Sequence, residues 1–134
     1  MLKKQIGTNV NDTAALLQKA IRMEAASESG MVRCVTCGKW LHYKSAEGGH
    51  FLAGRTASVV LEETNIHVQD NYCNQQLNGN QEAYTRYMLN HYGQDEIDRL
   101  KALKATTRQW TIEELLALKI EYKKRIAIQM ERLG

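Results

Sequence analysis

The stretch EGGHFLAGRTASVVLEETNIHVQDNYCN, from Glu47 to Asn74, decides how this chain is interpreted. It places two glycines before His50, a second histidine within N-I-H, and a cysteine directly followed by an asparagine. A further pair, Cys34 and Cys37, lies upstream in C-V-T-C. Two interpretations follow from these residues. One is a zinc knuckle that only holds a small fold together, and the other is a zinc knuckle that frames a catalytic site.

The three cysteines have a spacing that is typical of zinc ligands. C-x-x-C grips one ion from a tight turn, and Cys73 can join from a second knuckle. Asp70 stands where a second C-x-x-C would have its first cysteine. We therefore expect a structural zinc site of three thiolates and Asp70, with His67 or a water as alternative fourth ligands. Three thiolates favour zinc over hard cations. The alternative is three unlinked thiols, with Cys73 simply buried.

Composition limits the class of protein. The chain has 134 residues, of which 43% are hydrophobic and 25% charged, as in a soluble globular protein with one domain. It contains no apolar run of the roughly 18 residues that suggest a membrane helix. The N-terminus lacks the apolar segment of a secretory signal. We expect a cytoplasmic protein that does not bind membranes, and an odd cysteine count argues against a pure disulfide framework.

Three zones divide this predicted single domain of residues 1–134. In residues 1–30 the sequence predicts a helix over 12–27, capped by Asp12 or Thr13. Residues 31–80 predict short strands and hairpins, because short apolar runs alternate there with Gly, Asn and Ser. The runs are MVRCVTC, KWLHY, SVVLEE and NIHVQ. This zone has few large apolar residues with which to build a core, so we expect a bound metal to stabilise its fold.

Residues 81–134 form the third zone and predict helices. We expect one from residue 81 to a stop at Gly93, a second over 95–104, and a last one opened by a capping box at Thr111 to Glu114. The last helix carries an apolar stripe, which predicts a core face or a dimer seam. Its members are Ile112, Leu115, Leu116, Tyr122, Ile126, Met130 and Leu133.

Basic residues gather towards the C-terminus. The net charge is +3, and from Arg99 onward nine Lys or Arg stand against four Glu. A basic flank suits an anionic partner such as nucleic acid, although a solvated helix face would look the same.

The linked pattern C-x-x-C, G-H-F, N-I-H-x-Q-x-x-x-C-N, followed by N-G-N and H-Y-G, resembles the phage NinG/Rap recombination protein family. The resemblance begins near Leu17 and covers over half of the chain. The family is regarded as HNH-like and acts on branched DNA in phage recombination. The resemblance implies an α+β fold in which a small zinc-stapled ββα-metal core with a β-hairpin is flanked by an N-terminal helix and C-terminal helices. It implies a metal-dependent endonuclease for branched or recombination-intermediate DNA, placed in the host cytoplasm.

The resemblance also implies roles for single residues. His50 would be the general base that activates a water, and Asn65 would hold the histidine loop by hydrogen bonds. Asn74, with Glu47, would bind a catalytic Mg²⁺ or Mn²⁺ beside the structural Zn²⁺. Paired cuts would favour a homodimer. The residues expected to contact DNA are Arg55, which would neutralise the scissile phosphate, Arg86, Lys123, Lys124 and Arg125.

Two positions depart from the family pattern. Gly49 stands where many HNH sites have a metal-binding Asp or His, and Glu47 is the proposed replacement. Asp70 stands where the family usually has a cysteine, so it can serve the zinc site or the catalytic metal instead. These departures keep two alternatives open. One is a non-catalytic zinc-containing DNA-binding protein, and the other is a structural zinc domain that binds protein through its last helix.

Overall fold

The computed structural model describes residues 9–53 and 57–134. Its architecture is mixed α+β, with two small antiparallel hairpins among several helices. The longer elements are α2 (Val10–Ala25), β1 (Met31–Arg33), β2 (Trp40–His42), β3 (Glu47–His50), β4 (Ile66–Gln69), α3 (Gln81–His91), α4 (Gln94–Lys104) and α5 (Ile112–Leu133). The short helical turns are Tyr43–Ser45, Glu63–Asn65 and Tyr72–Gln76.

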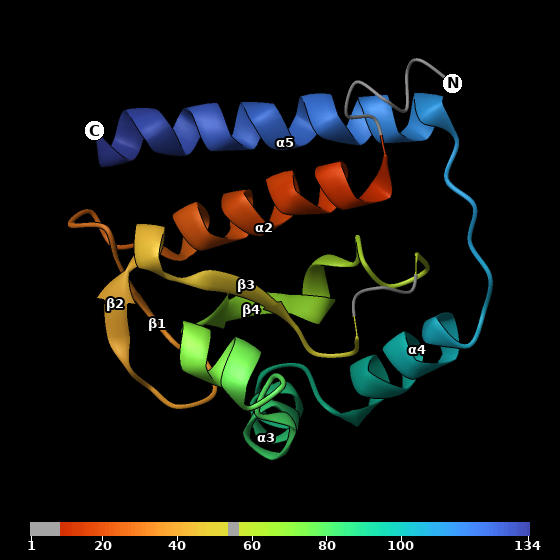
Figure 1. Ribbon diagram of the computed structural model, residues 1–134, viewed down its shortest axis with the longest axis horizontal. Coiled ribbons are helices and arrows are strands. Elements are labelled where there is room, and N and C mark those ends of the chain that lie inside the picture. Colours follow the sequence, from red (N-terminus) through yellow and green to blue (C-terminus); the bar gives the residue numbers. More distant parts are fainter. Residues whose placement is uncertain (1–8, 54–56) are drawn as a thin grey trace.

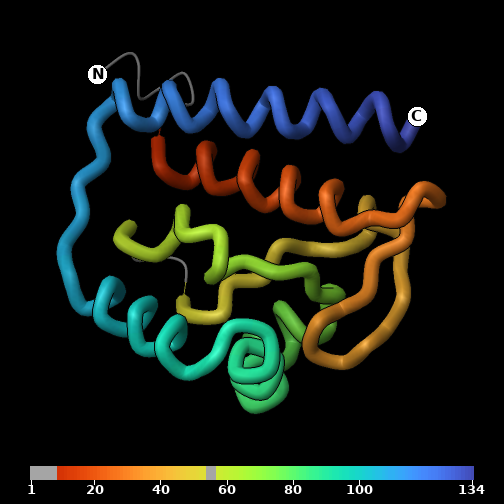
Figure 2. Tube along the Cα trace, turned by 180° about the vertical axis from the view of Figure 1, so that it is seen from behind, coloured from red at the N-terminus to blue at the C-terminus, as the bar shows by residue number. Residues whose placement is uncertain are grey.

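The elements are stacked in layers around the β3–β4 hairpin (Figure 1). Helix α2 packs on the hairpin, and α5 packs along the outer side of α2. Helices α3 and α4 lie on the opposite side of the hairpin, a separation that the reverse view also shows (Figure 2). No helix in the described parts of the chain is long and apolar enough to span a membrane.

Helix α2 begins earlier than the sequence predicted. Its N-cap is Asn9, whose side-chain oxygen accepts a hydrogen bond from the backbone N–H of Asp12 at 2.8 Å. The predicted caps, Asp12 and Thr13, instead lie inside the first turn. Asn is as good a cap as Asp, so the local pattern allowed either start.

The strands differ from prediction in the central stretch. EGGH, which lies in none of the predicted strands, forms β3 and pairs with β4 in the register Glu47 to Gln69 and His50 to Ile66. SVVLEE, which was expected to be a strand, forms turns instead. Its residues Val59, Val60 and Leu61 are buried, so their apolar character serves the core and not a sheet.

The two glycines of β3 are explained by close packing on both faces. A Cβ at Gly48 would stand 2.8 Å from the Cβ of Gln18 on α2. A Cβ at Gly49 would stand 1.9 Å from Oε1 of Gln69 on β4. Since real Cβ atoms do not approach other heavy atoms so closely, glycine lets the helix and the neighbouring strand come near this backbone.

The three predicted C-terminal helices are confirmed. Helix α3 ends at His91 before Gly93, whose φ is +99°, and α5 opens with a capping box between Thr111 and Glu114. Part of the predicted stripe on α5 is core, where Leu115 and Tyr122 join Leu17, Ile66 and their neighbours. Two other stripe members, Leu116 and Met130, are exposed.

His67 lies in a buried chain of polar groups that supports β3. Its Nδ1 contacts the Tyr84 hydroxyl at 3.0 Å, and its Nε2 contacts the Tyr92 hydroxyl at 2.7 Å. The Tyr84 hydroxyl donates its proton to the carbonyl of Gly49 at 2.7 Å, so it must accept from Nδ1–H of His67. Nε2 is then the acceptor of the Tyr92 proton, which requires a neutral imidazole.

This arrangement makes stability depend on pH. Burial, and then the nearby His91, lowers the pKa of His67 to about 4. The unfolded chain takes up this proton near pH 6.5, so stability falls as the pH drops below that value and continues to fall until about pH 4. We expect the unfolding free energy to decrease by about 1 kcal/mol more for the native chain than for His67→Gln between pH 7.5 and 5.5. Urea titrations at both pH values measure this difference, and parallel losses in the two proteins would contradict it.

Candidate functional site

Four side chains converge where the two hairpins meet. The sulfurs of Cys34, Cys37 and Cys73 and a carboxylate oxygen of Asp70 all lie within 4.8 Å of one another. The cysteines are free thiols. Cys34, Cys73 and Asp70 are buried, whereas Cys37 is exposed. The four ligands predicted from the sequence are thus brought together by the fold.

Local structure explains how each half of the cluster is shaped. Cys34 directly follows β1, and its carbonyl accepts from the N–H of Gly38, whose φ of +82° turns the chain back. Asp70 directly follows β4, and its Oδ1 accepts from the backbone N–H of Cys73 at 2.7 Å. The first knuckle therefore depends on a glycine turn, and the second depends on Asp70 as the cap of the following helical turn.

The donor set fits a metal such as zinc. Zinc is a borderline ion that binds both thiolate sulfur and carboxylate oxygen, the three sulfurs favour it over hard cations, and four is the number of ligands that structural zinc requires. Without a metal, desolvation and then the Asp70 carboxylate raise the pKa of Cys37 to about 12, and its thiol donates to Asp70 Oδ2 at 3.0 Å. The amide of Asn80 reaches Cys73 Sγ at 3.6 Å. Such outer contacts orient metal ligands.

His67, the alternative fourth ligand, is not part of this cluster. Both of its ring nitrogens are bonded to tyrosine hydroxyls. Asp70 is therefore the fourth member, because it begins the second knuckle while His67 points into the α3 side of the hairpin.

His50 ends β3 and is partly buried. Its Nε2 lies 3.1 Å from the carbonyl oxygen of Val60. A carbonyl can only accept, so Nε2 carries the proton and Nδ1 keeps the lone pair in the neutral ring. Burial lowers the pKa of His50, and the Val60 carbonyl only partly opposes this. The imidazole is consequently neutral near pH 7, with Nδ1 available as a base.

Asn65 is fully buried and bonds the loop that follows His50. Its Oδ1 accepts from the N–H of Leu52 at 2.8 Å. Its Nδ2 donates to the carbonyls of Leu52 and Val59 at 3.1 and 3.2 Å. Asn65 thus ties both ends of the loop to the start of β4, and the loop presents the Val60 carbonyl to His50. The residue lies in a 3-10 turn immediately before β4 and not on the strand that was expected.

Glu47 is the first residue of β3, and its carboxylate accepts hydrogen bonds from three side-chain amides in the turn after β4. Oε1 accepts from Asn74 at 2.6 Å and Gln75 at 3.0 Å, and Oε2 accepts from Asn71 at 2.9 Å. Burial alone would raise the pKa of Glu47, but these hydrogen bonds and the charge of Arg22 outweigh it and lower the pKa. Glu47 is therefore a carboxylate at neutral pH and lies in direct contact with Asn74.

A cavity of about 310 Å³ opens beside His50. Its other lining residues are Phe51, Leu52, Ala53, Asn78, Gln81 and Lys104. Lys104, at the end of α4, was not among the residues that the sequence analysis selected. Nothing local distinguishes it from the other lysines, because its position beside His50 is created only when α4 packs under the hairpin.

The residues predicted to contact DNA fall in different places. Arg55 lies outside the described residues. Lys123 and Lys124 are exposed on α5, in the outer layer. Arg125 forms ion pairs with Glu24 and Glu63, so its charge already joins α5 to α2 and to the turn before β4.

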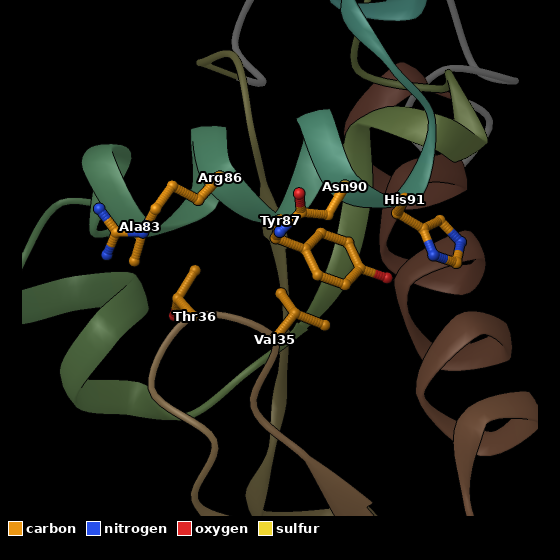
Figure 3. Close-up of a pocket in the computed structure, with 7 residues that line it drawn as sticks. All are labelled: Val35, Thr36, Ala83, Arg86, Tyr87, Asn90 and His91. Carbon is orange, nitrogen blue, oxygen red and sulfur yellow. The ribbon is translucent and has the colours of Figure 1, made fainter.

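Arg86 lies on α3 beside a second cavity, of about 360 Å³. In Figure 3, Val35 and Thr36 from the first knuckle face Tyr87 and its neighbours on α3. The rings of Tyr87 and His91 stack at 5.2 Å. Arg86 is exposed and pairs only weakly, with Glu82 one turn earlier, so its charge is open to a ligand.

Comparisons with known proteins agree on one family. A sequence profile described as "Bacteriophage Lambda NinG protein" matches residues 2–131. The chain is 28% identical over 110 residues to Protein ninG of Escherichia phage 933W, covering 81% of this chain and 54% of that protein. It is 29% identical over 110 residues to Protein ninG of Escherichia phage lambda, covering 81% and 53%. The chain therefore spans about half the length of the curated relatives it matches. No solved structure matches it.

Proposed function

The chain belongs to the NinG family, and from this membership together with the grouping of His50, Asn65 and Asn74 around the β3–β4 hairpin we propose that it is a metal-dependent DNA endonuclease of the HNH type. The observation that carries the proposal is the order along the hairpin. His50 ends β3, Asn65 precedes β4, and Asn74 lies in the helical turn after β4. Two antiparallel strands followed by a helical turn have the order expected of a ββα-metal core, and the cysteine and aspartate cluster includes Cys73, the residue before Asn74.

His50 would act through Nδ1. Because Nε2–H is held by the Val60 carbonyl, the ring can accept a proton from a water at Nδ1 without turning. The water oxygen forms a bond to phosphorus as its proton passes to His50, and the bond from phosphorus to the 3′ oxygen breaks. Cleavage would leave a 5′ phosphate and a 3′ hydroxyl. Asn65 would act by positioning, since its three side-chain bonds hold the loop that orients the imidazole.

Asn74 is the residue that would hold a divalent cation, Mg²⁺ or Mn²⁺. When bound, such an ion stabilises the charge that develops on phosphorus and on the leaving oxygen. The residues fit this ion, because Asn74 Nδ2 is committed to Glu47 and its Oδ1 therefore remains as an acceptor. The ionised Glu47 adds negative charge next to it.

Branched or recombination-intermediate DNA is the substrate we propose, and this part rests on the family resemblance. Arg86 on α3 and Lys104 beside the His50 cavity offer cations on the same side of the hairpin. Lys123 and Lys124 lie a layer away on α5, where they would contact a more distant part of the DNA. Two copies of the chain would suit a junction in which two strands are cut.

A nuclease assay tests the proposal. The zinc-loaded chain is incubated with a labelled four-way junction or a linear duplex, and with Mg²⁺, Mn²⁺ or chelator. We expect the junction to be cut in the presence of Mg²⁺ or Mn²⁺ and left intact with chelator. Tight binding to the junction without cleavage under any metal would refute the nuclease and leave a non-catalytic DNA-binding protein, for which Gly49 at an expected ligand position is the supporting feature.

Lys104 and Lys101 on α4 are a matched pair for testing whether DNA phosphate contacts the cavity beside His50. Lys104 lines the His50 cavity, whereas Lys101 is exposed on the same helix and does not line it. We expect Lys104→Ala to weaken junction binding and to reduce the slope of log affinity against log salt by about 1. Fluorescence anisotropy across a salt series measures both effects. Equal losses for Lys104→Ala and Lys101→Ala would show that the cavity has no special contact with phosphate.

A further inference from the structure

Gln69 has an unusual environment at the end of β4. Its side chain is fully buried. Its Nε2 donates to the carbonyl of Gly79 at 2.9 Å and to Thr36 Oγ1 at 3.1 Å. Its Oε1 has no hydrogen-bond partner among the described residues. A buried acceptor without a hydrogen-bond partner destabilises the folded chain, so the position of this oxygen calls for an explanation.

The orientation of the Gln69 amide is fixed by its neighbours. A flipped amide would place Oε1 against the Gly79 carbonyl, and two acceptors repel each other at that distance. Nε2 therefore faces Gly79 and Oε1 faces β3. The orientation of Asn74 is fixed in the same way, because its Nδ2 donates to the ionised Glu47 at 2.6 Å and its Oδ1 must point elsewhere.

Both free oxygens point to Gly49. The position of a Cβ on Gly49 lies 1.9 Å from Gln69 Oε1 and 3.1 Å from Asn74 Oδ1. Gly49 is also the residue directly before His50. Two amide oxygens from separate elements thus lie close to the space that a Cβ on residue 49 would fill, next to the proposed base.

We propose that Gln69 Oε1 and Asn74 Oδ1 together bind the divalent cation, and that Gln69 replaces the ligand that a side chain at position 49 would otherwise provide. This inference rests on the proposed function and names a ligand of that site. Amide oxygens are hard donors of the kind that Mg²⁺ and Mn²⁺ accept. Gly49 is required because only a residue without Cβ leaves room for the Gln69 oxygen.

The charge balance predicts weak binding in the absence of DNA. Both proposed ligands are neutral amides, and the Glu47 carboxylate acts on the site through its hydrogen bond to Asn74. Mg²⁺ usually keeps several waters and gains further ligands from substrate phosphates. The test must therefore detect a weakly bound ion and locate it without depending on turnover.

Paramagnetic broadening by Mn²⁺ in ¹H–¹⁵N spectra of the zinc-loaded chain meets both requirements. We expect substoichiometric Mn²⁺ to broaden first the side-chain amide signals of Gln69 and Asn74 and the backbone amide of Gly49, and Mg²⁺ to shift the same signals. Broadening centred on Asn71 and Gln75, with the Gln69 signal unchanged, would place the ion at the outer side of Glu47 and overturn the proposal. The absence of any localised broadening would overturn it as well.

The two glycines of β3 supply a variant and its control. Gly49→Ala forces the Gln69 oxygen away and is expected to weaken Mn²⁺ binding at least about tenfold, since a displaced ligand or support typically has this effect. Gly48→Ala meets the aliphatic part of Gln18 on the other face, so it stresses the same strand without touching either oxygen. Equal Mn²⁺ affinity in Gly49→Ala and Gly48→Ala would contradict the proposal.

The spectra test the cation site and the nuclease assay tests the proposed function, so either can be refuted without the other. If the junction is cut but the Gln69 signal does not respond to Mn²⁺, Gln69 is not a ligand of the cation, and the proposed nuclease activity is still supported. If Gln69 and Asn74 respond but no substrate is cut, the cation site is supported and the proposed nuclease function is refuted. Should Gly49→Ala not fold, the spectra of the native chain still decide the question.

Discussion

Replacing Cys73 with serine, or stripping the metal from the purified chain with a chelator, is expected to unfold the centre of the molecule. The cluster joins the turn after β1 to the turn after β4, and these hairpins are only three and four residues long per strand. Hairpins of this size are marginal in water without added support. Structural zinc in small domains binds with an apparent free energy of about 10–16 kcal/mol, which exceeds the total stability of many domains.

The loss should be regional. Helices α2 and α5 bury their own contacts through Leu17, Leu115 and Tyr122, so we expect helical circular dichroism to be partly retained. Amide signals from residues 31–50 and 66–80 should collapse to the narrow range of an unfolded chain. Metal analysis should find about one zinc per chain before treatment and none after it. An intact spectrum of the metal-free chain would contradict the structural role.

Asp70→Cys is the matched control for this experiment. The substitution restores the cysteine expected at this position and completes a four-thiolate set. We expect it to retain zinc and to resist a competing chelator at least as well as the native chain, because thiolate is the softer ligand. Loss of zinc in Asp70→Cys would show that the carboxylate is required as the cap of the Cys73 turn, which it also contacts.

Replacing His50 with glutamine is expected to reduce the rate of junction cleavage by about 10²–10⁴-fold, the usual contribution of a positioned general base. The glutamine Nε2 can still donate to the Val60 carbonyl, so the loop should keep its shape while Nδ1 is lost. Affinity for the junction and zinc content should stay unchanged. Single-turnover cleavage and anisotropy on the same preparations separate the two effects.

The pH profile gives an independent check on His50. Burial lowers the pKa of its imidazole, so the neutral base persists below the usual histidine value of about 6.5. Cleavage should therefore begin to fall only at a pH below that value, and this acid limb should be absent from the residual activity of His50→Gln. A limb centred above pH 7, or one that the variant keeps, would assign the titration to another group.

Features that depend on residues close in sequence were predictable. The C-x-x-C spacing, the third cysteine and the capping box at Thr111 are each set by a few neighbouring residues, and each lies where expected. The stop of α3 at Gly93 follows the same logic. Membership of the NinG family was also visible in the linked motifs, and the family profile confirms it.

Features that depend on distant partners were not predictable. SVVLEE has the composition of a strand, but its Val60 and Leu61 join a core cluster with residues of α2 and α5. EGGH pairs with β4, and its two glycines leave room for Gln18 and Gln69. The ion pair of Arg125, a predicted DNA contact, with Glu24 on α2 was also not visible in the sequence. Lys104 and Gln69 gained their positions only from packing.

The sequence by itself thus determined the three cysteines of the candidate metal cluster and the ends of the C-terminal helices, since turns and caps are encoded within three or four residues, whereas the fourth member of the cluster, Asp70, was decided by the fold. Only the tertiary structure decided which strand flanks His50, which cations remain open to a partner, and which oxygens face Gly49. The reason is that burial and hydrogen bonding between elements tens of residues apart outweigh local preference wherever the two disagree.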